Sequence, residues 1–174
     1  MMKHTLLATA ASLLIAAAPL AHVMAQDEAG QRPAKASKAS AKRAVTKPAV
    51  ATPAHKLAIQ VNENNPQSMN LALNNARNVV EYYQAKGETV AIEIVAYGPG
   101  LHMLRDDTSP VKQRIATMAL ENPSIAFIAC ANTQANMSKQ ENKPITLISE
   151  AKSMPSGVVR LMELQKQGYA YIRP

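Results

Sequence analysis

The chain has 174 residues, of which 19 are Lys or Arg and 12 are Asp or Glu, and it contains one cysteine and no tryptophan. A single cysteine excludes an internal disulfide framework, so the fold must depend on its hydrophobic core. The net charge of +7 does not predict nucleic-acid binding, because the excess of basic side chains lies near the N-terminus, without interleaved aromatic residues.

Residues 1–25 have the pattern of a secretory signal peptide. Lys3 provides a basic start, Leu6 to Leu20 form an apolar stretch too short to span a bilayer, and small residues precede Ala25. We expect cleavage after Ala25 and export, to the periplasm; the alternative is an uncleaved anchor helix. No later segment approaches transmembrane length, so we do not expect an integral membrane protein.

Residues 26–54 are predicted to be a disordered basic linker. The segment consists mainly of Ala, Lys, Pro, Ser and Thr, and it carries six basic and two acidic side chains. Such a composition buries too little apolar surface to offset the entropy of ordering. We expect a solvated tether with weak affinity for anionic envelope surfaces.

Residues 55–174 suit one compact domain in which strand and helix alternate. His55–Val61 and Thr89–Tyr97 are expected strands, and the helix between them is expected to begin at Ser68 and to end at Gly87. A short helical turn over residues 101–105 is expected to follow. The remaining elements are a helix starting at Ser109-Pro110 and ending at Asn122-Pro123, a strand over 125–130, a short helix over 133–139, a strand over 145–148, a helix capped by Ser156 that runs to Gln167, and a strand over 169–172. This order predicts an α/β fold with a mostly parallel sheet covered by helices on both faces.

Cys130 is the main candidate for chemistry. It ends the uncharged run that starts at Ile125, and in open α/β sheets ligands gather beyond the carboxyl ends of the strands. A helix that starts just after Cys130 would favour the thiolate, and the backbone N–H groups of Ala131, Asn132 and Thr133, with the Thr133 hydroxyl, could stabilise a bound anion or a terminal sulfur. The alternative is a thiol that packs as a small apolar side chain.

Gly98 and Gly100 flank a proline directly after a predicted strand, so their N–H groups would emerge at the same sheet edge as Cys130. The motif is neither a dinucleotide fingerprint nor a P-loop, and a tight turn is the preferred interpretation of so short a motif. His102 follows closely and is a candidate base for the thiol, although a lone loop histidine is commonly just exposed. No metal-ligand spacing and no cofactor motif is present, so neither a metal nor a cofactor is expected.

The domain resembles the DsrE/DsrF-like sulfur-relay family, in particular an exported branch of it. The resemblance is carried by the Asn70–Asn78 helix, by Val95-Ala-Tyr-Gly-Pro-Gly100, by Phe127-Ile-Ala-Cys-Ala-Asn-Thr133 and by Gly168-Tyr-Ala-Tyr-Ile-Arg173. It implies a three-layer α/β/α sandwich around a five-stranded, mainly parallel sheet, assembled into homotrimers or hexamers. It also implies that Cys130 carries a persulfide between a sulfur donor and an acceptor protein. The sulfur-relay members are cytoplasmic and work with partner subunits, whereas this chain carries an export signal.

Two functions of different classes follow. The first is an exported sulfur carrier or sulfurtransferase, in which the Cys130 thiolate takes up a sulfane sulfur and passes it on. The second is a non-catalytic oligomeric module that binds a small anion or a partner protein at the carboxyl edge of the strands.

Overall fold

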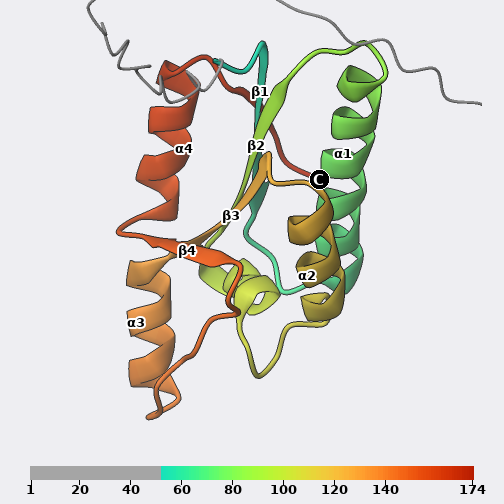
Figure 1. Cartoon of the computed structure of the whole chain (residues 1–174). Helices are drawn as coiled ribbons and strands as arrows, with labels where there is room; N and C mark the ends of the chain where they lie inside the picture. The colour runs from blue at the N-terminus through green and yellow to red at the C-terminus, as the bar shows by residue number, and fades with distance from the viewer. Residues whose placement is uncertain (1–51) are drawn as a thin grey trace, which may run out of the picture. The chain divides into compact units, whose positions relative to one another are not determined.

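The computed structural model describes residues 52–174 (Figure 1). The predicted signal peptide and the predicted linker up to residue 51 lie outside the described residues. Within residues 52–174, no helix combines the length and the hydropathy needed to cross a membrane.

Five parallel strands form the sheet in the order β4-β3-β2-β1-β5. The strands are β1 (His55–Val61), β2 (Val90–Ala96), β3 (Ile125–Cys130), β4 (Ala151–Met154) and β5 (Ala170–Ile172). The helices are α1 (Pro66–Gln84), α2 (Lys112–Glu121), α3 (Ala131–Gln140) and α4 (Gly157–Lys166), with a 3-10 helix, η1 (Gly98–Leu104), after β2. The expected α/β fold with a five-stranded parallel sheet is therefore confirmed.

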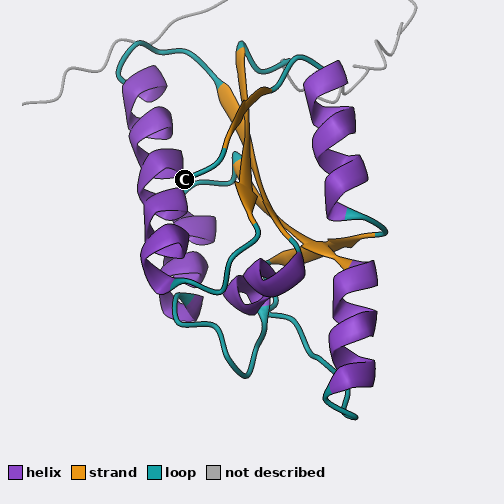
Figure 2. Cartoon of the chain, turned by 180° about the vertical axis from the view of Figure 1, so that it is seen from behind, coloured by secondary structure: helices purple, strands orange, loops and turns teal. Residues whose placement is uncertain are grey.

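Helices cover both faces of the sheet, with α1 and α2 on one face and α4 on the other (Figures 1 and 2). Side chains alternate along the strands, so each strand supplies both cores. In β1, Leu57 and Ile59 join the larger core under α1 and α2, whereas Ala58 joins the smaller core under Leu161 and Leu164 of α4. Arg160 of α4 adds a bidentate ion pair with Glu93 of β2, at 2.9 and 2.5 Å.

The connections diverge at the carboxyl ends of β3 and β4. The chain leaves β3 into α3, whose Met137 packs against the larger core, and leaves β4 into α4 on the opposite face. The connection from β4 to β5 crosses the sheet in the direction opposite to the connections that lead from β1 through β2 and β3 to β4. Because crossovers between parallel strands are right-handed, the helix in this last connection, α4, lies on the opposite face. Such a switch point is where open α/β sheets place ligand sites.

Two predicted helix starts were wrong by a few residues. Helix α1 begins at Pro66, and Asn65 rather than Ser68 is the cap: Asn65 Oδ1 accepts hydrogen bonds from the N–H groups of Gln67 and Ser68, at 2.8 and 3.3 Å. Helix α2 begins at Lys112, because the Ser109 hydroxyl donates to the Met103 carbonyl and holds the segment before the helix as a turn.

The predicted strand over residues 145–148 was wrong. Strand β4 lies at Ala151–Met154 instead, and within 145–148 only Leu147 makes an isolated antiparallel bridge, to Arg105. Ile145 and Ile148 are buried, and Ile148 belongs to the larger core, but both residues lie in a loop. The edge strand β4 is polar and partly exposed, so the hydrophobic pattern favoured the apolar segment 145–148 instead.

Candidate functional site

Cys130 lies at the topological switch point. It is the last residue of β3, its backbone pairs with Met154 at the end of β4, and it occupies the N-cap position of α3. The N-termini of α3 and α4 therefore start from adjacent strand ends. Helix N-termini carry partial positive charge and unpaired N–H groups, so this location favours a negative charge on the sulfur.

The donors around the sulfur change the pKa of the thiol. Burial acts to raise the pKa of Cys130, but hydrogen bonding outweighs burial and the pKa lies below its usual value. The donors are, in decreasing order of effect, the Thr133 hydroxyl and the N–H groups of Gly157, Thr133 and Asn132. The sulfur makes no closed capping hydrogen bond to α3, so Thr133 and Asn132 act on it as nearby donors. The donors therefore stabilise the thiolate form.

Gly98 and Thr133 meet, as their predicted positions at one sheet edge require. The Gly98 N–H donates to Thr133 Oγ1 at 3.0 Å. Since that oxygen accepts from Gly98, its own proton remains available to donate to the Cys130 sulfur. Gly98 has a φ of +51°, a left-handed conformation that favours glycine. The glycine loop thus acts on the thiol through the threonine hydroxyl.

Gly157 is a site residue that the sequence analysis missed. It is the first residue of α4, and its N–H is one of the donors that lower the pKa of Cys130. A Cβ atom at this position would lie only 3.0 Å from Tyr97 Cβ, so the close packing of α4 on Tyr97 favours a glycine. The signal was the Ser156-Gly157 pair, which was interpreted only as a helix start.

The other predicted residues have different roles. The Gly100 N–H donates to the Tyr97 carbonyl, and a Cβ at Gly100 would lie 2.3 Å from the Val61 carbonyl oxygen, so Gly100 is a packing glycine. His102 Nδ1 lies 2.8 Å from Thr108 Oγ1, which directs it to the loop after η1, and it is not among the groups that act on Cys130.

Ala131 and Asn132 were also predicted to supply backbone donors, and the two residues differ in the structure. Ala131 begins α3, and its N–H is not among the donors that act on the sulfur. Asn132 is among them, but its N–H also donates to the Pro155 carbonyl at 3.2 Å. That bond ties the start of α3 to the loop that leads into α4.

Cys130 is only 5% exposed, and two cavities adjoin its neighbours. One has a volume of about 300 Å³ and is lined by Gly98, Pro99, Thr133, Asn136, Met137 and Gln140. A smaller one of about 150 Å³ is lined by Met154, Pro155, Ser156, Val159, Arg160 and Glu163. Cys130 lines neither cavity, so each one approaches the sulfur without opening onto it.

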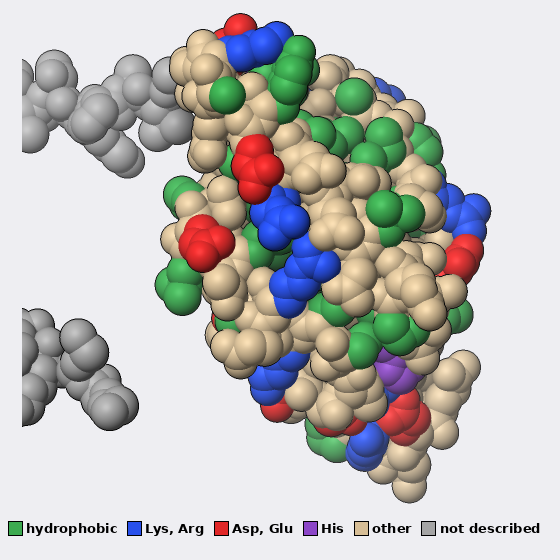
Figure 3. All heavy atoms as spheres, turned by 90° about the vertical axis from the view of Figure 1, so that its right-hand side faces the viewer, with side chains coloured by type: hydrophobic (Ala, Val, Ile, Leu, Met, Phe, Trp, Pro, Cys, Tyr) green, Lys and Arg blue, Asp and Glu red, His purple; other side chains and the backbone are tan. Residues whose placement is uncertain are grey.

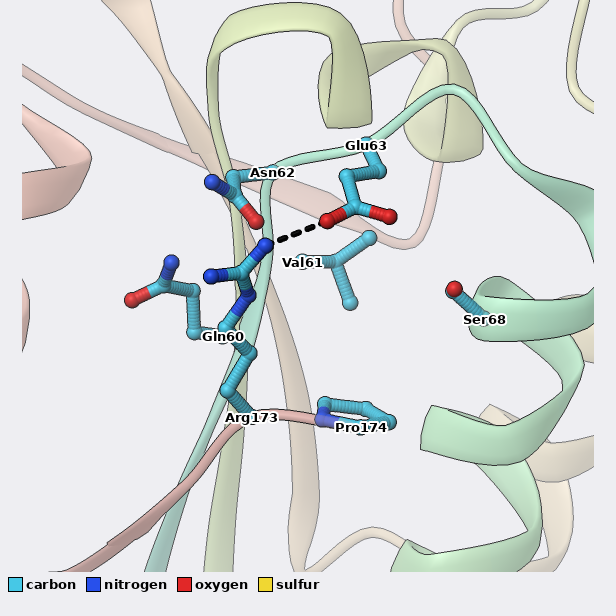
Figure 4. Close-up of a pocket in the computed structure, with 7 residues that line it drawn as sticks. All are labelled: Gln60, Val61, Asn62, Glu63, Ser68, Arg173 and Pro174. Carbon is cyan, nitrogen blue, oxygen red and sulfur yellow. Dashed lines mark hydrogen bonds and ion pairs between the residues drawn. The ribbon is translucent and has the colours of Figure 1, made fainter.

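A third hollow at the carboxyl edge holds no site for a substrate. It lies between the end of β1, the start of α1 and the C-terminal residues, and Figure 4 shows Arg173 reaching across it to pair with Glu63. Ser68 of α1 stands at its far side. Its volume is about 10 Å³, the space of a single water molecule.

No group of three or more His, Cys, Asp or Glu side chains within residues 52–174 is placed to hold a metal ion. The most buried charge is Arg105, which is 1% exposed and closes η1. Its guanidinium pairs with Asp107, at 2.9 and 2.8 Å, and with Glu141, the C-cap of α3. This ion-pair group ties η1 to the far end of α3.

Comparison with known proteins supports the fold. No protein-family model matches the chain, and no curated protein matches it. A similar solved structure is that of MTH1491, a protein of unknown function from Methanobacterium thermoautotrophicum, with a TM-score of 0.57 and 29% sequence identity. The match covers 69% of this chain and 99% of that one. The chain is thus similar to an α/β protein whose activity is itself unknown.

Proposed function

We propose that this protein is an exported sulfur carrier in which Cys130 binds sulfane sulfur as a persulfide. The observation that carries the proposal is the position of Cys130 at the end of β3, at the N-cap of α3 and beside the end of β4, close to the start of α4. Nearby donors at these helix starts lower the pKa of its thiol. Burial among apolar groups alone would raise the pKa of a cysteine that served only as packing, whereas the pKa of Cys130 is lowered. The resemblance to the DsrE/DsrF-like family supports the same role for Cys130.

The proposed step is a sulfur exchange with no net redox change. The Cys130 thiolate attacks the terminal sulfur of a donor R–S–SH, a bond forms between Cys130 Sγ and that sulfur, and the donor S–S bond breaks. The electron pair leaves with R–S⁻, and Cys130 becomes Cys–S–SH. An acceptor thiolate then attacks the outer sulfur in the same way and releases the Cys130 thiolate, which the Thr133 hydroxyl and the Gly157 N–H stabilise.

The cavity beside Thr133 gives the donor its approach. Gly98, Pro99 and Thr133 line it on the side of the thiol, and Asn136 and Gln140 supply amide groups along α3. Since Cys130 does not line this cavity, a donor seated there reaches the sulfur after a local displacement at the start of α3. The proposal therefore includes a small opening as part of each transfer.

Intact-mass spectrometry tests the proposal directly. The full chain is treated with glutathione persulfide and, separately, with thiosulfate, and both samples are weighed before and after reduction. We expect a gain of one sulfur atom that reduction removes and that is absent in Cys130→Ser. Lack of an adduct under both treatments, in a chain that is folded by circular dichroism, would overturn the proposal.

The burial of Cys130 favours a second candidate, the non-catalytic module. With 5% exposure, the thiol can serve as packing while the edge of the sheet binds a partner protein or a small anion. This reading predicts a thiol that resists iodoacetamide in the folded protein and reacts only after denaturation. If iodoacetamide instead labels the folded protein, at a rate whose pH dependence shows a lowered thiol pKa, the non-catalytic module is excluded.

The resemblance also supports two proposals about context. We infer a homotrimeric or hexameric assembly and export to the periplasm through the N-terminal signal sequence. Light scattering of the mature protein tests the first inference, and N-terminal sequencing of the exported form, with cleavage expected after Ala25, tests the second.

A further inference from the structure

A groove between α1 and α2 shares no residue with the Cys130 site. It has a volume of about 400 Å³ and is lined by Arg77, Gln113, Arg114, Thr117, Met118, Glu121 and Asn122. Figure 3 looks onto this side of the molecule, and near the middle of the face it shows two basic side chains next to each other. The groove therefore combines a concave surface with two arginines and one glutamate.

Helix α1 presents three polar side chains on one face, of which Arg77 lines the groove. Asn70, Asn74 and Arg77 follow each other at intervals of four and three residues, so they share one helix face. Arg114 reaches this face from α2: its Nη1 donates to Asn70 Oδ1 at 2.7 Å and to the Asn70 carbonyl at 3.3 Å, and its Nη2 donates to Asn74 Oδ1 at 2.5 Å. The guanidinium is thus fixed in place by neutral oxygen atoms.

The positive charge of Arg114 has no carboxylate partner within residues 52–174. Arg77 makes one loose pair, with 3.6 Å between its Nε and Glu81 Oε1, and both of these side chains are more than half exposed. Burial and the nearby charge of Arg77 both lower the pKa of Arg114. Two guanidinium groups are therefore held close together at a cost in mutual repulsion, which a bound anion would relieve.

We propose that this groove binds a small oxyanion of the phosphate type between Arg77 and Arg114. Guanidinium groups match phosphate and carboxylate oxygens with paired N–H donors. The oxygens of Asn70 and Asn74 hold the Arg114 guanidinium in place, and its remaining N–H groups can donate to an anion. Gln113 lines the same groove and adds an amide donor. Glu121 lines it as well, and its negative charge reduces the affinity for any anion.

The test is isothermal titration calorimetry of the full chain with inorganic phosphate, in a chloride buffer at constant ionic strength. We expect saturable binding that weakens by about tenfold or more in Arg77→Gln, as loss of a charged hydrogen-bond donor implies. Glu121→Gln should strengthen binding, because it removes a nearby negative charge. Lys166→Gln is the matched control, since it removes one positive charge from the exposed side of α4 and should leave binding unchanged.

Arg114 is not varied in this test, because its removal would also break the hydrogen bonds that join α2 to α1. Arg77→Gln leaves those contacts intact, and it should raise the thermal midpoint of the phosphate-free protein by removing the repulsion, while it abolishes the further rise that phosphate causes. A variant that folds poorly would have a lower midpoint without phosphate, so it could not reproduce a higher midpoint combined with the loss of the phosphate effect. Acetate at equal ionic strength tests for a carboxylate, and we expect it to bind more weakly than phosphate.

Three results would overturn the proposal. The first is the absence of saturable phosphate binding by the folded wild-type chain. The second is an equal loss of binding in Arg77→Gln and Lys166→Gln, which would indicate only nonspecific charge. The third is saturable binding of acetate without binding of phosphate, which would assign the groove to a carboxylate ligand.

Discussion

The N–H of Gly98 donates to Thr133 Oγ1 at 3.0 Å and so joins the start of η1 to the first turn of α3. This bond fixes the direction in which the threonine hydroxyl can donate. The hydroxyl is the strongest of the hydrogen-bond donors that lower the pKa of Cys130. A glycine from one strand end therefore acts on a cysteine at the next strand end through a third residue.

Removal of this hydroxyl should make the thiol less reactive. Thr133→Val keeps the shape of the side chain but removes the donor, so the pKa of Cys130 should rise and alkylation of the folded protein at neutral pH should slow by about two- to tenfold. The rate of iodoacetamide labelling as a function of pH measures this. Thr133→Ser retains the hydroxyl and serves as control; an equal change in both variants would contradict the role of the hydroxyl.

A methyl group at Gly157 should destabilise the protein and disturb the thiol together. Its Cβ would lie 3.0 Å from Tyr97 Cβ, and such overpacking costs about 1–3 kcal/mol. We expect Gly157→Ala to lower the free energy of unfolding by this amount in urea denaturation and to raise the pKa of Cys130, because the Gly157 N–H is displaced. Val158→Ala, at an adjacent position that is half exposed, should change stability by less than about 0.5 kcal/mol. Similar losses in the two variants would refute the packing argument.

The ion pairs of Arg105 should make stability fall in acid. Hydrogen bonding to Arg105 lowers the pKa of Glu141 to about 2, and hydrogen bonds from Arg105 and Lys143 lower that of Asp107 as well. A carboxylate with a depressed pKa in the folded state contributes stability that is complete above its pKa in the unfolded chain. That contribution is lost as the pH falls toward the folded value.

Urea unfolding at neutral pH and at about pH 3 measures this effect. Glu141→Gln should be less stable than wild type at neutral pH, and the difference should shrink in acid as Glu141 is protonated in the unfolded chain. Glu150→Gln changes a carboxylate without an ion pair in the structure and should show neither effect. A difference for Glu141→Gln that stays constant with pH would show that these ion pairs do not link stability to pH.

The smaller core should depend on Leu164 rather than on the outer side of α4. Leu164 is fully buried against the sheet, and truncation to alanine should cost about 2–5 kcal/mol in unfolding free energy. Met162 lies on the same helix but is 54% exposed, so Met162→Ala should cost less than about 1 kcal/mol. Equal costs for both variants would contradict the assignment of the buried face.

The sequence predicted the central part of the fold because central strands are the most strongly patterned. β3 was predicted to end at Cys130, and it does, because it is a continuous apolar run. β1 was predicted to the residue, because its apolar residues are followed at once by the turn formers after Val61. The edge strand β4 was missed, because its sequence Ala-Lys-Ser-Met is polar and partly exposed. The position of β4 is determined by its pairing with β3 and not by the hydrophobic pattern of its own sequence.

The same limit explains which site residues could be predicted. Gly98 and Thr133 follow the central strands β2 and β3, and parallel strands place their carboxyl ends side by side, so both were expected at one sheet edge. The bond between them was not predicted. Gly157 follows β4, which was predicted in the wrong place, and nothing in the local sequence Ser156-Gly157 indicates that its N–H lowers the pKa of Cys130. His102 was a candidate by proximity in sequence, but the turn of η1 directs it to Thr108.

The attachments of α3 have a mechanical consequence. Its first turn is bonded to Gly98 at the start of η1, and its C-cap residue Glu141 is paired with Arg105 at the end of η1. Two helical segments bridged at both ends cannot pivot independently. A displacement confined to the start of α3, as sulfur transfer at Cys130 requires, must therefore break the bond between Gly98 and Thr133 first, while the buried η1 stays on the sheet.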